Sequence, residues 1–125
     1  MHTQVDAVFG RLEQGRLSQP PAGSFPGPSS GWEAKLPDGT MVVRSTLQDE
    51  ARPLIALGAD AVPSLLPWVQ HANAAIRYTA TFALEQITGE HPELAVFDDA
   101  DRDGRARAIA VWQRWYDAHR VPRRG

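Results

Sequence analysis

The sequence contains no cysteine, which excludes disulfides and thiolate metal sites. This absence fits a reducing compartment, so we expect a cytoplasmic protein. No window approaches the roughly 18 apolar residues of a membrane span, and no apolar run follows a basic N-terminal segment. Neither a membrane helix nor a signal peptide is therefore predicted. Lysine occurs once against twelve arginines, a usage typical of a GC-rich bacterial genome.

Sequence motifs for catalysis are also missing. There is no Gly-rich phosphate loop and no nucleophile elbow, and the four histidines lack the i, i+4 spacing of a zinc site. We therefore expect a protein that is not an enzyme and binds no cofactor or metal.

One acidic stretch matches the opening of a calcium loop. Residues 99–104, DADRDG, have the D-x-D-x-D-G pattern, but the twelfth position, which should supply a bidentate Glu, is Ala110. These carboxylates are instead expected to cap the helix that follows and to complement its dipole.

The net charge of −2 creates no global field for nucleic acid or an anionic membrane. Seven arginines lie between Arg102 and Arg124, and we interpret them as a solvated helix face and tail. Nucleic acid and membranes are therefore not expected as partners.

The length of 125 residues favours a single domain, residues 1–125. Residues 19–31 contain four Pro and three Gly and predict a loop or linker, while residues 120–125 read as a flexible tail. Apolar residues recur at helical spacing in most of the remainder. Helices are expected near residues 3–16, 46–57, 61–71, 74–88 and 101–118.

Two features refine the expected helices and one breaks the helical pattern. Ser45 or Thr46 is expected to cap the second helix in a capping box, and Pro67 is expected to bend the third. Residues 32–44 instead predict a small β-hairpin around the Pro37-Asp38-Gly39-Thr40 turn. Apolar residues alternate on both sides of that turn: Trp32, Ala34 and Leu36 before it, Met41 and Val43 after it.

A repeat is visible in the middle of the chain. Two predicted helix stops, Gly58 and Gly89, lie 31 residues apart, and Leu54 and Leu84 match at a spacing of 30. A two-helix unit of that period points to an α-solenoid.

The same segment carries a family resemblance. Leu57-Gly58-x-Asp60-Ala61-Val62-Pro63-x-Leu65-Leu66 resembles the turn and first helix of a HEAT-like repeat of the phycobilisome-lyase type, and Ile76-Arg77-Tyr78-x-Ala80-x-x-Ala83-Leu84 resembles its second helix. The resemblance covers residues 46–89, weakly 101–119, and none of the first 45. It implies a mainly α fold, a short HEAT-like α-solenoid or α-α superhelix of about five helices. The chain holds about one and a half repeats, where three or more are usual.

HEAT-like repeats serve as adaptors, enzyme subunits and inhibitors, so the resemblance indicates a class of function only. We expect a protein–protein interaction module, either a bacterial immunity protein that neutralises a toxin or an adaptor that scaffolds a partner such as an enzyme subunit. The alternative is a subunit or regulator of an enzyme or of a nucleic-acid-acting HEAT-repeat protein. The sequence does not set the oligomeric state.

Candidate partner-binding residues are aromatic and charged positions at the edges of the apolar stripes and in the acidic run. They are Trp68, Arg77, Tyr78, Asp98, Asp99, Asp101 and Trp115. Arg77 also has a structural interpretation, which we favour: the resemblance to HEAT-like repeats implies that it ties the start of its helix to an Asp, here Asp60, or to a carbonyl of the inter-repeat turn. The acidic run would steer a basic partner by long-range attraction.

Overall fold

The computed structural model describes residues 3–16, 33–93, 98 and 100–119, and this part of the chain is mainly helical with one two-stranded antiparallel sheet. Three short helices, of 3₁₀ or α type, follow one another between two of the longer helices. In chain order the elements are α1 (Thr3–Glu13), β1 (Glu33–Lys35), β2 (Met41–Val43), α2 (Arg44–Leu57), the 3₁₀ helix η1 (Gly58–Ala61), α3 (Val62–Leu65), the 3₁₀ helix η2 (Leu66–Gln70), α4 (Ala74–Thr88) and α5 (Arg102–His119). The predicted mainly α fold with a small hairpin is thus confirmed.

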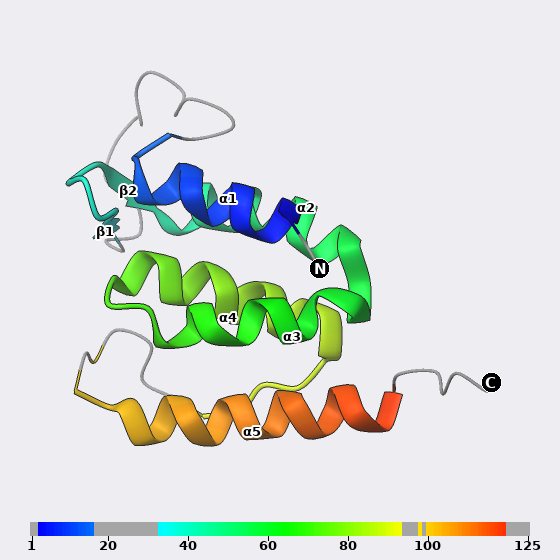
Figure 1. Ribbon diagram of the computed structural model, residues 1–125. Coiled ribbons are helices and arrows are strands. Elements are labelled where there is room, and N and C mark those ends of the chain that lie inside the picture. The colour runs from blue at the N-terminus through cyan, green and yellow to red at the C-terminus, as the bar shows by residue number, and fades with distance from the viewer. Residues whose placement is uncertain (1–2, 17–32, 94–97, 99, 120–125) are drawn as a thin grey trace.

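The helices lie roughly side by side in three levels (Figure 1). α1 and α2 form the first level, α3 with η2 and α4 form the second, and α5 lies below them. α2, α4 and α5 run in one direction, whereas α1 and the α3–η2 segment run in the opposite one. α2 packs most extensively on α4, and α5 packs mainly on η2 and α3. None of the helices in the described residues is long and apolar enough to cross a membrane.

α4 is the central element, and its limits are those that the sequence predicts. The side-chain Oδ1 of Asn73 accepts a hydrogen bond from the Ile76 N–H at 3.1 Å, which caps the helix start. The helix ends at Gly89, whose φ of +74° is the left-handed conformation that glycine adopts readily. Most α4 side chains are buried, because α2, the α3–η2 segment, β1 and α5 surround the helix.

The hydrophobic core draws on every level of the structure. Its fully buried members come from α1, the hairpin, α2, the α3–η2 segment, α4 and α5, and include Val5, Phe9, Leu12, Leu36, Leu47, Leu54, Leu65, Val69, Ile76, Leu84 and Trp112. The apolar stripes at i, i+3, i+4 and i+7 that predicted the helices are therefore the surfaces that pack.

The third expected helix is not continuous. A single turn of α-helix, α3, lies between η1 and η2, and the change to 3₁₀ geometry occurs at Leu66. Pro67 has no N–H to bond to a carbonyl one turn back, so an α-helix cannot continue through it without losing that bond. The predicted bend at Pro67 is therefore a change of helix type.

The start of α2 differs from the predicted capping box. The helix begins at Arg44, its N-cap is Val43, and no side-chain oxygen caps it. Val43 is the last residue of β2 and already has the extended conformation of an N-cap residue, with φ −109° and ψ 170°. The chain therefore passes from strand to helix without the loop in which Ser45 or Thr46 would cap.

The hairpin turns where predicted, but Met41 and Val43, the alternating apolar residues of its second strand, do not form its inward face. The Leu36 N–H donates to the Thr40 carbonyl at 2.8 Å, and Gly39 has a φ of +97°. This loop pairs Ala34 with Val42, so Val42 shares the inward face with Leu36. Met41 faces outward and is 48% exposed.

The other helix boundaries agree with prediction to within three residues. α1 ends at Glu13 rather than at residue 16, and α5 begins at Arg102, within one residue of the expected start. The predicted loop 19–31, the tail 120–125 and Trp32 lie outside the described residues.

Candidate functional site: the His71 turn and the α2–α4 face

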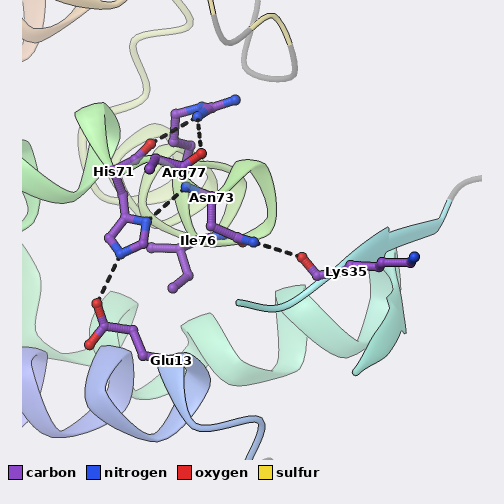
Figure 2. A network of polar contacts seen from close by, with 7 residues as sticks. Glu13, Lys35, His71, Asn73, Ile76 and Arg77 are labelled. Carbon is purple, nitrogen blue, oxygen red and sulfur yellow. Dashed lines mark hydrogen bonds and ion pairs between the residues drawn. The ribbon is translucent and has the colours of Figure 1, made fainter. Parts of the chain in front are cut away.

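The turn between η2 and α4 gathers polar contacts from three elements (Figure 2). At its centre, Nε2 of His71 lies 2.9 Å from Oε2 of Glu13 on α1, and Nδ1 of His71 lies 2.9 Å from the backbone N of Asn73. A backbone N–H can only donate, so Nδ1 is the acceptor. The neutral ring must then carry its proton on Nε2 and donate it to Glu13.

Asn73 joins this turn to the hairpin. Its Nδ2 donates to the carbonyl of Lys35 on β1 at 2.9 Å, while its Oδ1 caps α4 (Figure 2). One amide side chain therefore fixes both the start of α4 and the position of β1.

Arg77 closes the turn from the side of α4. Its Nη1 donates to the carbonyls of His71 at 2.8 Å and Ala72 at 3.1 Å, and the residue is only 1% exposed. A bond from Arg77 to turn carbonyls is what the structural interpretation of the sequence predicts, although these carbonyls belong to the turn directly before α4. Arg77 is therefore withdrawn as a partner-binding candidate, because so buried a side chain presents no surface to another protein.

Trp68 is half-buried and takes part in internal packing. Its ring stacks on Phe9 of α1, with centroids 4.5 Å apart, and lies 5.8 Å from the His71 ring in a nearly parallel orientation. A ring used to join η2 to α1 is a weaker candidate for partner binding than one with a free face.

Tyr78 and Phe82 form a half-buried stripe on α4, next to α2. Their rings are nearly parallel with centroids 6.1 Å apart, and the Tyr78 hydroxyl accepts a hydrogen bond from Nε2 of Gln48 on α2 at 2.9 Å. One turn further along the two helices lie exposed Arg52, which pairs with Asp49 at 3.4 Å, and exposed Gln86. We call the surface formed by Gln48, Arg52, Tyr78, Phe82 and Gln86 the α2–α4 face.

The acidic run caps α5, as the sequence predicts. Oδ1 of Asp101 accepts from the Gly104 N–H at 3.1 Å, and Oδ1 of Asp98 accepts from the Ala100 N–H at 2.9 Å. This cap requires a glycine at position 104, since a Cβ there would lie 2.2 Å from Oδ2 of Asp101. Asp99 lies outside the described residues, among which no group of His, Asp and Glu could hold a metal ion.

One of the C-terminal arginines contradicts the predicted solvated face. Arg105 is buried, and it donates from Nε to Oε1 of Gln70 and from Nη1 to the Asp98 carbonyl, both at 2.8 Å. Its spacing of i, i+3, i+7 with Ala108 and Trp112 places it on the buried stripe of α5, a signal that the sequence contains. Arg105 therefore fastens α5 to η2.

Trp115 is half-buried on α5 and contacts its own helix. Its ring stacks on His119 at a centroid distance of 4.2 Å, and Nδ1 of His119 lies 2.9 Å from the Trp115 carbonyl. The structure thus brings Trp68 and Arg77 together at the His71 turn, and it leaves Tyr78, Trp115 and the acidic run on separate elements.

Glu85 is the titratable side chain on α4 with a clear electrostatic perturbation. Burial raises the pKa of Glu85 above its ordinary value, and the imidazole of His91, whose Nδ1 lies 3.6 Å from the carboxylate, lowers it by a smaller amount. A folded-state pKa above the unfolded one means that the folded chain binds this proton more tightly. The stability therefore falls as the pH rises from the unfolded-state pKa to the folded-state pKa.

Glu85→Gln is therefore expected to stabilise the protein slightly at neutral pH, by less than about 1 kcal/mol because the group is partly exposed. The gain should disappear below the ordinary Glu value of about 4.5, where the wild-type carboxyl is also neutral. Urea unfolding of both proteins at several pH values measures the difference. Exposed Glu93→Gln is the control, and its difference in stability from the wild type should not change with pH. If Glu85→Gln is instead less stable than the wild type at neutral pH, the contact with His91 outweighs burial.

No protein-family model matches the chain, and no curated protein or solved structure proves similar to it. What the protein does must therefore be inferred from its own residues and their geometry.

Proposed function

We propose that this chain is a non-enzymatic protein-binding module, a short HEAT-like α-solenoid whose α2–α4 face binds a partner protein. Support for the solenoid comes from the two antiparallel pairs, α1 with α2 and the α3–η2 segment with α4, which lie one above the other (Figure 1). The second helices of the two pairs run in the same direction and contact each other. Stacking of this kind buries the apolar face of each unit against its neighbour.

The observation that carries the proposed binding role is the Tyr78–Phe82 stripe. Nine of the fifteen residues of α4 are buried, yet these two large rings remain partly in contact with solvent. Tyr is enriched at the centres of protein interfaces because it buries much area at little entropic cost. Polar Gln48 bonds to the Tyr78 hydroxyl, and exposed Arg52 and Gln86 follow one turn further along the two helices. Polar residues beside partly exposed rings match the apolar centre and polar rim of an interface.

The acidic start of α5 supplies a second element of the proposed binding mode. Asp98 is exposed. The start of α5, which follows it in the chain, lies at the same end of the molecule as the start of α4 (Figure 1). A negative rim beside the face would accelerate association with a basic partner and make it sensitive to salt. An immunity protein that neutralises a basic toxin and an adaptor that holds a basic subunit both fit this description.

Tyr78→Ala and Phe82→Ala are each expected to speed dissociation of the partner about tenfold or more, as for interface hot spots. The partner would be recovered by affinity capture with the full chain, and binding kinetics then measured for each variant after its folding is verified. Trp115→Ala, which alters a half-buried aromatic residue on another helix, is the matched control and should leave dissociation unchanged.

The reverse result would move the interface to α5. If Trp115→Ala weakens binding while both α4 variants bind like wild type, the α2–α4 face is not the contact surface. If capture recovers nucleic acid alone, the proposed class of function is wrong.

A further inference from the structure

The three histidines in the described residues differ in what their Nδ1 atoms face. Nδ1 of His91 faces the Glu85 carboxylate at 3.6 Å, and Nδ1 of His119 faces the Trp115 carbonyl at 2.9 Å. Both neighbours are acceptors, so a proton on either Nδ1 has a hydrogen-bond partner. Nδ1 of His71 faces the N–H of Asn73, which is a donor. Protonation of His71 is therefore the one event of this kind, among these three residues, that must break a hydrogen bond.

We propose that His71 is a pH-sensitive latch on the turn between η2 and α4. While the imidazole is neutral, its lone pair holds the Asn73 N–H and its Nε2–H holds Glu13 (Figure 2). When Nδ1 gains a proton, two N–H groups point at each other across 2.9 Å, and the bond to Asn73 is lost. The bond to Glu13 becomes an ion pair and is retained. The ring therefore stays bound to Glu13 of α1, while Asn73 separates from the ring.

The residue that is released matters because of its other contacts. Asn73 caps α4 through Oδ1 and holds the Lys35 carbonyl of β1 through Nδ2. Of these three groups of Asn73, only the backbone N–H has a titratable partner, the His71 imidazole. Loss of that partner frees the peptide unit that positions the side chain, so protonation at His71 is transmitted to the contact between the hairpin and α4.

The charged groups around His71 act on different sides of the residue. Glu13, from α1, faces Nε2 at 2.9 Å. Arg77, from α4, is held by the backbone carbonyls of the turn, and Arg105, from α5, bonds to the neighbouring Gln70. From β1 the turn receives the Lys35 carbonyl. The His71 side chain is 21% exposed, which gives a proton access from solvent.

The test is an NMR titration of the full chain from about pH 8 to pH 5, the range in which imidazoles ordinarily change charge. At the upper end, the ring nitrogens of His71 should show the Nε2–H tautomer. As the ring gains its second proton, the Asn73 amide signal should shift along the same curve. Amide exchange at Asn73, corrected for its intrinsic pH dependence, should become about fivefold faster, the factor for one hydrogen bond of ordinary net strength.

Two variants and one internal control make the result decisive. His71→Asn should abolish the pH response of the Asn73 amide, and Glu13→Gln, which keeps the ring and both of its bonds, should preserve it. The titration of His119 should leave exchange of the amides near Trp115 unchanged. The latch is ruled out if His71 stays neutral down to pH 5, if it shows the Nδ1–H tautomer at pH 8, or if it titrates while Asn73 does not respond.

Discussion

Trp112→Ala is expected to lower the free energy of unfolding by about 3–5 kcal/mol, the range for removing a large buried aromatic side chain. Trp112 is completely buried on α5, in the level below α4, and its Nε1 donates to the Glu90 carbonyl at 3.2 Å. The substitution removes packing between two levels and leaves that carbonyl without its donor. Urea unfolding followed by far-UV circular dichroism measures the change.

Trp112→Phe separates the contribution of packing from that of the hydrogen bond to Glu90. The variant keeps an aromatic ring in the core and loses the N–H, so it should cost clearly less than Trp112→Ala, with about 1 kcal/mol from the hydrogen bond. Arg107→Ala, at an exposed position of the same helix, should change stability by no more than about 0.5 kcal/mol. If Trp112→Ala costs as little as Arg107→Ala, α5 does not dock on the rest of the core as described.

Leu84→Ala is expected to cost about 2–5 kcal/mol, because it leaves a cavity at a fully buried position of α4. Alanine is the best helix former, so the loss measures packing rather than helix propensity. The same unfolding experiment applies, with Gln86→Ala as the control on the exposed side of the helix. The control should change stability by no more than about 0.5 kcal/mol.

A loss below roughly 0.5 kcal/mol for Leu84→Ala would mean that this stripe faces solvent and that the helical phase is wrong. It would also remove the basis for the α2–α4 face, since the partial exposure of Tyr78 and Phe82 depends on the same phase. The stability experiment therefore tests the geometry on which the proposed binding surface depends.

Several local features of this protein follow from its sequence. Asn73 and Gly89 mark both ends of α4, Asp101 caps α5, and the turn at Pro37–Thr40 produces the hairpin. Each of these features depends on a few neighbouring residues, through a side-chain cap, a left-handed glycine or a turn, so the signal and its effect lie within one or two turns of chain.

Contacts between distant segments were decided by the tertiary structure. The partners of His71 and Asn73 include Glu13, 58 residues from His71, and Lys35, 38 residues from Asn73. The bond from Arg105 to Gln70, 35 residues away, buries an arginine that composition alone assigns to solvent. Periodicity identifies which face of a helix is apolar, but it does not specify which other element covers that face. A polar side chain finds its partner only when packing of the levels brings the two together, because no local pattern encodes that pairing.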